Sequence, residues 1–356
     1  MLFTNSLTNN FVWVYGDFSF SVEVTAKYAK NLKEYLHHHM GHDLSHGNFN
    51  GYYNIGHFTY IIDNDIFDTY LRTVEENKVT ERYIFSDEPY IIANVNGCNI
   101  FMQKDVMIVY RVKNQICIYV RENQQCLYQF LRVVREIIYR TQEDRNRVFM
   151  HAAACERSGH GILILGEKGA GKTTLLNYFL DKGSDYVAND RVFLISDKDK
   201  IYIEGFPIPM RVSKETMKKT KKFEITSKLY RINLANTNKY LITPLEINSL
   251  YSVNTLYSSN LSYIIIPKIS INDTRFSITE CNPSNALDVF KMNCFTPYDE
   301  SRHTQWIASC NLSKLKLEEN AKNIMNKMLE YPIYQVEYGT LLEPEFIIAE
   351  INKYIK

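Results

Sequence analysis

Gly161-Ile-Leu-Ile-Leu165, followed at once by Gly166-Glu-Lys-Gly-Ala-Gly-Lys-Thr173, is the stretch of the chain that decides its fold. The order predicts a buried strand, a phosphate-binding loop and a helix. Three glycines allow the backbone to turn tightly around a phosphate, so that successive N–H groups and a helix N-terminus point at one anion. The alternative is a glycine-rich turn between a strand and a helix that binds nothing.

The residues expected to bind a nucleotide are contiguous. They are Gly166, Glu167, Lys168, Gly169, Ala170, Gly171, Lys172, Thr173 and Thr174. We expect Lys172 to be an exposed ligand of phosphate, and the Thr173 hydroxyl to contact Mg²⁺. The apolar pattern of residues 174–180 predicts the helix that follows the loop. The ligands expected from the motif are therefore a nucleotide and Mg²⁺; we expect the nucleotide to be ATP, although the motif does not distinguish ATP from other nucleotides.

Composition limits the classes of partner. The chain has 356 residues, of which 45% are hydrophobic and 23% charged, which is enough for two domains with their own cores. Lys and Arg number 41 against 40 Asp and Glu, so no net charge recruits nucleic acid or an anionic membrane. The seven cysteines form no Cys-x-x-Cys pair, and no apolar run reaches the roughly 18 residues of a membrane span. We expect a cytoplasmic protein with reduced thiols.

Residues 1–122 predict a mixed α+β domain, and peptide recognition is one use that such a domain could have. Residues 11–15 and 18–24 flank a Gly-Asp turn as a hairpin, and residues 107–112 and 116–120 form a second hairpin. Residues 25–35 are expected to form a short helix between them.

Five histidines cluster after this helix, at His37, His38, His39, His42 and His46. Imidazoles at this spacing can converge on a metal ion. No cysteine or regular carboxylate pattern joins them, so a polar helix end and an exposed loop is the favoured interpretation.

Apolar residues recur every three or four positions through residues 123–147, which predicts an amphipathic connecting helix. Residues 148–155 are then expected to be a strand that opens the nucleotide-binding domain, residues 148–356.

Asn189-Asp190-Arg191 interrupts an apolar, strand-like run at residues 186–195. A charge in such a run is costly unless it is paired or binds a metal. We expect Asp190 to join Thr173 on Mg²⁺. The alternative is a tight turn between two strands.

Met150-His-Ala-Ala-Ala-Cys155, residues 161–174 and Tyr186-Val-Ala-Asn-Asp-Arg-Val192 together resemble, in order and spacing, the core of the bacterial HPr kinase/phosphorylase family. The layout is also similar to HPr-kinase-like enzymes that phosphorylate serine on ribosomally made peptides, such as lasso-peptide precursors. The resemblance covers about residues 148–212. It implies a P-loop domain of the HPr-kinase/PEP-carboxykinase type.

The resemblance also implies roles for single residues. His151 would lie near the transferred phosphate, and its alternative is a hydrogen-bonded histidine at a strand edge. The family has two adjacent aspartates where this chain has Asn189 and Asp190, and a serine where it has Thr173. The segment that serves the phosphorylase activity has no clear counterpart, so neither HPr nor the reverse reaction is expected.

The second half of the chain adds weaker signals. Residues 201–212 predict a strand and a Pro-bounded loop that brings Arg211 to the phosphates. The basic residues 214–222 are typical of a solvated helix face, and attraction of an acidic peptide or of the phosphates is the alternative. Residues 223–238 are polar and could form a lid or substrate loop. Further strands are expected at 239–244, 261–268 and 334–338, and helices at 286–290 and 320–329.

The sequence thus predicts an α/β kinase that transfers the γ-phosphate of ATP to a Ser or Thr hydroxyl of a peptide or small protein. Lys172 holds the phosphates, Thr173 and Asp190 hold Mg²⁺, Arg211 stabilises the developing charge, and Asp190 orients the hydroxyl. Asn189 stands where the family has a base, so we expect slow catalysis. A nucleotide-binding regulator without chemistry and a small-molecule kinase are the alternatives. Assembly into a homo-oligomer is compatible with the sequence.

Overall fold

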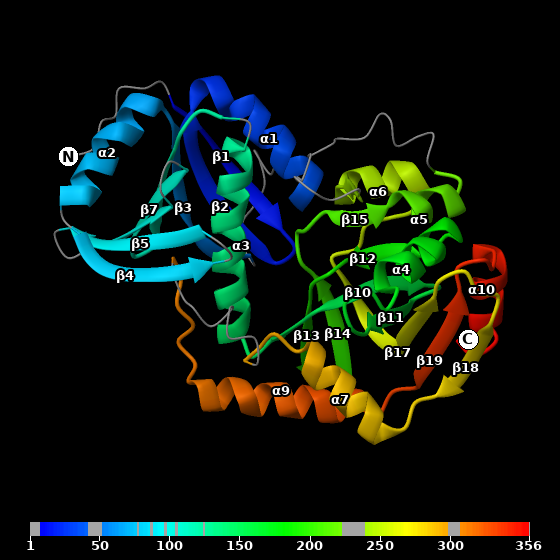
Figure 1. Ribbon diagram of the computed structural model, residues 1–356. Coiled ribbons are helices and arrows are strands. Elements are labelled where there is room, and N and C mark those ends of the chain that lie inside the picture. The colour runs from blue at the N-terminus through cyan, green and yellow to red at the C-terminus, as the bar shows by residue number, and fades with distance from the viewer. Residues whose placement is uncertain are drawn as a thin grey trace. The chain divides into compact units, whose positions relative to one another are not determined.

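A computed structural model describes most of the chain. The described residues are 8–41, 52–76, 78–85, 88–95, 98–103, 106–123, 125–222, 239–297 and 307–355. By contacts, the chain divides into two compact units. The first comprises Met1–Thr141 with His303–Asn311, and the second comprises Gln142–Arg302 with Leu312–Lys356. The fold is a mixed α/β fold with several sheets (Figure 1).

The first unit is built on one eight-stranded sheet in the order β1-β2-β3-β8-β7-β6-β5-β4. The strands are β1 Thr8–Tyr15, β2 Phe18–Thr25, β3 Tyr53–Ile62, β4 Lys78–Phe85, β5 Glu88–Val95, β6 Cys98–Gln103, β7 Met107–Val112 and β8 Gln115–Val120. Both expected hairpins are confirmed, because β1 pairs with β2 and β7 with β8 in antiparallel register. The helices are α1 Ala26–Met40, α2 Asn64–Glu76 and α3 Cys126–Asp144.

Side chains of β3 pack alternately against two different helices, α3 and α2. Phe58 and Tyr60 contact the ring of Phe130 on α3, at centroid distances of 5.5 and 5.0 Å. Ile61 belongs instead to the apolar cluster that contains Phe67 of α2. Because successive side chains of a strand point to opposite faces, α3 and α2 cover opposite faces of the sheet.

The larger sheet of the second unit has nine strands and is built around the long strand β17, Ser258–Ser270. The first residues of β17 pair with β14, and later ones pair with β11 and β19. The other strands are β9 Val148–Met150, β10 Ala152–Arg157, β11 His160–Leu165, β12 Asp185–Ala188, β13 Val192–Asp197, β14 Lys200–Gly205, β18 Phe276–Glu280 and β19 Ile333–Gly339. A separate pair consists of β15 Met210–Ser213 and β16 Lys239–Ile242.

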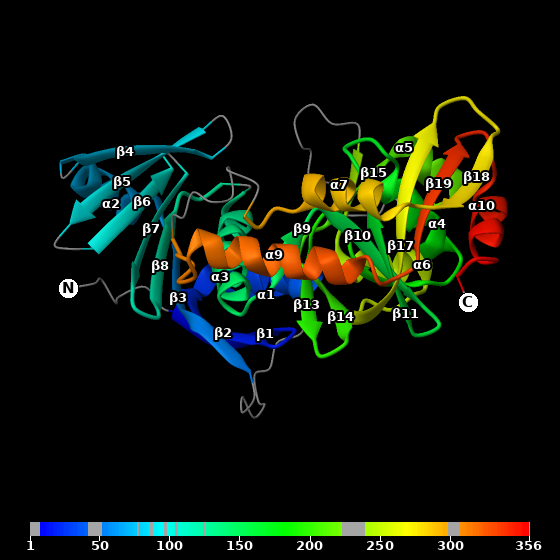
Figure 2. The same ribbon diagram turned by 90° about the horizontal axis from the view of Figure 1, so that it is seen from below.

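Helices cover both faces of this sheet, which explains why β11 is apolar along nearly its whole length. Ile162 and Ile164 face the core beneath α4 and α10, whereas Leu163 and Leu165 face the core beneath α7 and α9. Figure 2 shows α7 and α9 side by side over one face. The helices are α4 Lys172–Asp181, α5 Lys214–Lys219, α6 Pro244–Tyr251, α7 Pro283–Asn293, α9 Lys314–Met328 and α10 Pro344–Ile351.

One predicted element is wrong. Residues 148–155 do not form one strand, because the chain breaks at His151 into β9, which pairs with β13, and β10, which pairs with β11. The backbone N–H of His151 donates instead to the carbonyl of Asn293, at 2.7 Å.

The remaining strand and helix predictions of the second unit are confirmed, with ends that differ by a few residues. The predicted lid or substrate loop, residues 223–238, lies outside the described residues. None of the described helices combines the length and the hydropathy that a bilayer crossing requires.

Candidate functional site

The glycine loop, residues 166–171, joins the end of β11 to the start of α4. Gly169 and Gly171 have φ values of 90° and 103°, which side chains rarely adopt. A β-carbon on Gly171 would also lie 2.6 Å from Tyr338 Oη. Position 169 therefore requires glycine because of its φ angle. Position 171 requires glycine because of its φ angle and because there is no space for a β-carbon.

Two neighbouring strands fix the back of the glycine loop. The Ile269 N–H on β17 donates to the Ala170 carbonyl at 3.1 Å, and Tyr338 Oη on β19 donates to the Gly171 carbonyl at 3.1 Å. Tyr338 is only 1% exposed, so this donor is held rigidly. The first N–H groups of α4, like those of any helix, have no partner within the helix. The loop thus presents a fixed helix N-terminus to an anion.

Lys172 is not the exposed side chain that we expected. It is only 8% exposed, and its ammonium lies along the loop. Nζ donates to the carbonyls of Gly166 and Glu167, at 2.6 and 3.2 Å. Burial lowers the pKa of Lys172 to about 8, although the negative charge of Asp190 opposes this shift. The ammonium is therefore already positioned at the loop before any ligand binds.

Thr173 meets Asn189 rather than Asp190. Thr173 Oγ1 donates to Asn189 Oδ1 at 3.0 Å, and Asn189 is 3% exposed. Asp190 has φ of 71°, so the chain turns between the end of β12 and the start of β13. This turn sends the two neighbouring side chains in different directions. The oxygen beside the Thr173 hydroxyl is thus a carboxamide oxygen, and the expected binding of Mg²⁺ by Thr173 and Asp190 stays a prediction.

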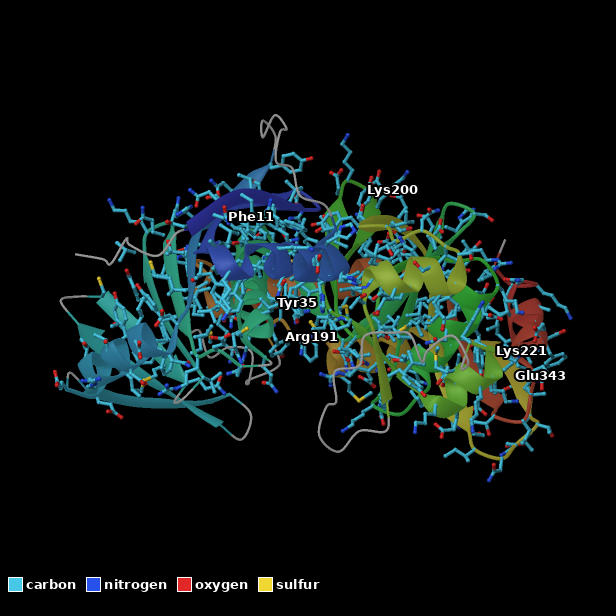
Figure 3. The ribbon with its side chains drawn as sticks, turned by 90° about the horizontal axis from the view of Figure 1, so that it is seen from above. Phe11, Tyr35, Arg191, Lys200, Lys221 and Glu343 are labelled. Atoms are coloured by element: carbon cyan, nitrogen blue, oxygen red, sulfur yellow. The ribbon has the colours of Figure 1, made fainter. Side chains whose placement is uncertain are left out.

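Asp190 pairs with His151 and Arg191 instead. His151 Nε2 lies 3.2 Å from Asp190 Oδ1, and Arg191, labelled in Figure 3, places Nε 3.5 Å from Asp190 Oδ2. Burial opposes ionisation of Asp190. The hydrogen bond from His151, with the charges of Arg191, His151 and Arg211, outweighs burial and lowers the pKa of Asp190 to about 2. Asp190 is therefore a carboxylate at neutral pH.

The imidazole of His151 is oriented on three sides. Its ring stacks on Phe295, with centroids 5.6 Å apart and planes 13° apart. Its Nε2 faces Asp190, and its backbone is held by Asn293. Among the residues that the structure describes, none forms a hydrogen bond with Nδ1. In a neutral histidine that gives Nε2–H to a carboxylate, the lone pair is on Nδ1.

Two other predicted residues lie at the border of the site. Arg211 on β15 is exposed, and its charge reaches Asp190. Thr174 turns away from the glycine loop, since its Oγ1 lies 3.3 Å from Thr216 Oγ1 on α5. The structure therefore gathers Lys172, Thr173, Asn189, Asp190 and His151, with Arg211 nearby and Thr174 outside.

Sequence reasoning missed Phe295 and Tyr338, which orient His151 and the glycine loop. Both lie more than 140 positions along the chain from the residues that they hold, and neither belongs to a motif. No local signal could have found them.

The histidine cluster is only partly described. His37, His38 and His39 lie in the last turn of α1, whereas His42 and His46 lie outside the described residues. His39 is 2% exposed and stacks on Tyr35, so this part of the helix end is buried. Burial lowers its pKa well below the ordinary range. Within the described ranges, no group of three or more His, Cys, Asp or Glu side chains is arranged to hold a metal ion.

Part of the basic stretch is neutralised by the chain itself. Lys219 Nζ lies 3.7 Å from a carboxylate oxygen of Glu343, and Lys222 Nζ lies 3.8 Å from one of Asp181. Attraction of an acidic peptide to this stretch stays a prediction.

The sequence matches no family model and no curated protein. Among solved structures, the chain is similar to the Hpr(Ser) kinase/phosphatase from Coxiella burnetii. The two share 11% identity, the match covers 58% of this chain and 99% of that chain, and the TM-score is 0.26. With an identity and a TM-score this low, the likeness carries no conclusion about activity.

Proposed function

We propose that the second unit is a P-loop kinase domain of the HPr-kinase type. In this proposal it transfers the γ-phosphate of ATP to a Ser or Thr hydroxyl of a peptide or small protein. The observation that carries the proposal is the glycine loop with the Lys172 ammonium bonded to two of its carbonyls and the Thr173 hydroxyl bonded to Asn189 Oδ1. A glycine-rich turn without a ligand would not need a buried ammonium at this position.

The residues present fit a nucleotide phosphate. Lys172 Nζ is held by two loop carbonyls, which a phosphate oxygen can replace with a stronger, charge-assisted bond. The loop leads into a ten-residue helix, whose N-terminus favours an anion. Mg·ATP would supply the phosphoryl group and the cation that neutralises its charge.

Two oxygens are candidates for Mg²⁺. Thr173 Oγ1 and Asn189 Oδ1 lie 3.0 Å apart, and both are neutral oxygen ligands of the kind that Mg²⁺ accepts. Asp190 contributes its charge from the neighbouring position. Asn189 thus keeps a ligand oxygen while the site carries one negative charge fewer than the two aspartates of the family that the sequence resembles.

His151 is the group best placed to take the proton of the acceptor hydroxyl. Asp190 fixes the imidazole through Nε2, so Nδ1 receives the proton as the hydroxyl oxygen bonds to phosphorus and the bond to the leaving diphosphate breaks. Asp190 itself is too weak a base for this task, since its pKa is about 2. Arg211 stabilises the charge that develops on the transferred group.

A second candidate function is nucleotide-dependent regulation without phosphotransfer. The observation that favours it is the hydrogen bond from Thr173 to Asn189, because the carboxamide of Asn189 cannot act as a base. A small-molecule kinase is a further alternative. We also propose, from the sequence, that the acceptor is a ribosomally made precursor peptide and that the protein acts in the cytoplasm.

Incubation of the full chain with γ-labelled ATP, Mg²⁺, cell metabolites and peptides encoded beside its gene separates these functions. The proposal predicts label on Ser or Thr of a peptide. Label on a metabolite would support a small-molecule kinase, and bound nucleotide without transfer would support a regulator.

A further inference from the structure

The last residue of α7 and the three residues after it, residues 293–296, lie against the chain at His151. The His151 N–H donates to the Asn293 carbonyl at 2.7 Å, and the Phe295 N–H donates to the Phe149 carbonyl at 2.8 Å. A single antiparallel bridge lies between these two bonds. The backbone of residues 293–296 is therefore fixed beside β9 and His151.

The ring of Phe295 contacts two rings of the neighbouring chain. It stacks on the His151 imidazole, with centroids 5.6 Å apart, and its centroid lies 5.5 Å from that of Phe149. Aromatic rings at such distances attract each other. A turn of the Phe295 side chain would end the stacking, so the orientation of the imidazole depends on the position of Phe295.

The residue after Phe295 is anchored in the core. Thr296 Oγ1 donates to Glu143 Oε1 at 2.8 Å, and both residues are 0% exposed. Glu143 belongs to the last turn of α3, 153 positions away along the chain. A hydrogen bond to a carboxylate is stronger than one between neutral groups, and breaking it leaves a buried group without this partner. The bond therefore holds the chain one residue away from the ring that stacks on the imidazole.

We infer that Glu143 and Thr296 are positioning residues for the His151 imidazole. They act through the ring of Phe295. This inference rests on the proposed function, in which the imidazole takes the proton of the acceptor hydroxyl. With the bond in place, the ring stays stacked on the imidazole and Nε2 stays beside Asp190. Without it, both contacts are lost for part of the time.

The alternative is a purely structural bond. In that case the packing of Phe295 on Phe149 is sufficient to hold the ring, and the bond between Thr296 and Glu143 stabilises the fold without acting on His151.

NMR of the full-length protein without nucleotide or acceptor distinguishes these two cases. The histidine rings carry ¹³C and ¹⁵N, and His151→Gln identifies the signals of His151. A stacked aromatic ring displaces the proton signals of the imidazole, and Phe295→Leu gives their position without stacking. We expect Thr296→Val to move the His151 signals towards that position. Thr296→Ser keeps the hydroxyl and should restore the wild-type signals. Signals of Thr296→Val that coincide with those of wild type would overturn the inference.

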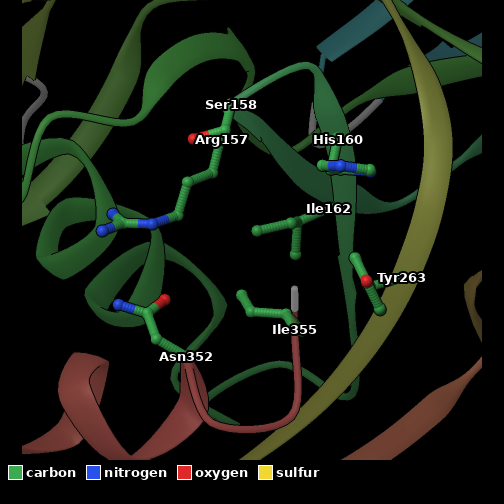
Figure 4. Close-up of a pocket in the computed structure, with 7 residues that line it drawn as sticks. All are labelled: Arg157, Ser158, His160, Ile162, Tyr263, Asn352 and Ile355. Carbon is green, nitrogen blue, oxygen red and sulfur yellow. The ribbon is translucent and has the colours of Figure 1, made fainter.

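His160 is the internal control. It begins β11, at the other end of the strand from the glycine loop, and lines a cavity of about 250 Å³ together with Tyr263 (Figure 4). Its signals should stay in place in every variant, because none of the substitutions lies in the lining of this cavity.

Thr220→Val is the matched control variant. Thr220 is 3% exposed, and its Oγ1 donates to the Thr216 carbonyl at 3.3 Å. The substitution thus removes another buried hydroxyl of the second unit, and the His151 signals should not move. If Thr220→Val displaces them as far as Thr296→Val does, the effect is a general loosening of the unit and the inference is wrong.

Stability is measured in parallel by thermal unfolding. Thr296→Val leaves the Glu143 carboxylate buried without this donor, which is costly. If it does not fold, the double variant Glu143→Leu/Thr296→Val decides, because replacing both partners by apolar groups costs less than removing one. The same displacement of the His151 signals is expected, and unchanged signals would contradict the inference.

Kinetics then connect the orientation to catalysis. Thr296→Val should lower the single-turnover transfer rate by about tenfold or more, with the affinity for Mg·ATP unchanged, since the misplaced group is the proton acceptor and not a ligand of the nucleotide. A normal rate in a variant with displaced signals would overturn the role in catalysis. Displaced signals in a protein that transfers no phosphate would support the positioning of the imidazole and refute the proposed function.

Discussion

Asn189→Asp replaces the asparagine of this chain with the aspartate that the family it resembles has at the same position. The new carboxylate would keep the hydrogen bond from Thr173 at 3.0 Å, but it would be buried beside Asp190 at a position that is 3% exposed. Burying one such charge with a single donor costs about 2–3 kcal/mol. For a unit of this size, that corresponds to a decrease in Tm of about 5–10 °C without ligand.

The pH dependence of this loss has a definite sign. Burial and the charge of Asp190 raise the pKa of the new carboxyl group in the folded state, so the folded variant binds more protons than the unfolded one. Its destabilisation relative to wild type should therefore be largest at pH 8 and should shrink as the pH falls towards 5. Melting curves of both proteins at the two pH values, with and without Mg²⁺, measure this effect.

Asn177→Asp is the matched control. Asn177 is also buried, and its Nδ2 donates to the Thr173 carbonyl at 2.6 Å. We expect Mg²⁺ to restore stability to Asn189→Asp, where the carboxylate lies beside a proposed ligand of the cation, but not to Asn177→Asp. Equal behaviour of the two variants towards Mg²⁺ would refute the placement of Asn189 in the metal site.

The same variant tests the chemistry. We expect the single-turnover rate on an acceptor peptide to fall, since a second negative charge repels the γ-phosphate. A gain of about tenfold or more, equivalent to about 1.4 kcal/mol in barrier height, would instead show that the site lacks a base that a carboxylate can supply.

Substitutions at three other positions test the remaining roles. His151→Gln should lower the transfer rate by about 10²–10⁴ while Mg·ATP affinity, measured by calorimetry, stays unchanged, and a normal rate would leave the imidazole without a role. Thr173→Val should lose Mg²⁺-dependent nucleotide binding, whereas Thr173→Ser should keep it, and equal binding by both would exclude the hydroxyl as a ligand. Asp190 has a pKa of about 2 against an ordinary 3.8, so its carboxylate stabilises the fold above about pH 4 and loses that effect as the pH falls through 2. Since the side chain is 45% exposed, Asp190→Asn should lower the free energy of unfolding by at most about 1 kcal/mol at pH 7 and should not change it near pH 2. The substitution should also remove most of the activity. A loss of stability that does not depend on pH would contradict the pairing of Asp190 with His151.

Local patterns in the sequence were sufficient to predict much of the second unit. The apolar run of β11, the glycines after it and the apolar spacing of α4 depend on neighbouring residues alone, and all three elements form where they are expected. The break between β12 and β13 was also predictable, because Asn and Asp tolerate the left-handed backbone that Asp190 adopts.

Features that depend on distant residues could not be predicted in this way. The break at His151 follows from a hydrogen bond to Asn293, 142 positions away along the chain. The contact of Thr173 with Asn189 rather than Asp190 depends on the direction of two adjacent side chains in a turn. The burial of Lys172 depends on the path of the glycine loop, which Tyr338 and Ile269 hold from two other strands.

The affinity of Mg·ATP for wild type and for Lys172→Ala, measured by calorimetry, tests the central claim most directly. Lys200→Ala, which removes an exposed lysine of the same unit, is the control. Because the Lys172 ammonium provides a charge-assisted contact to phosphate, we expect its loss to weaken binding by at least about tenfold, while the control binds like wild type. Equal affinity of Lys172→Ala and wild type would contradict the account of the glycine loop as a phosphate site.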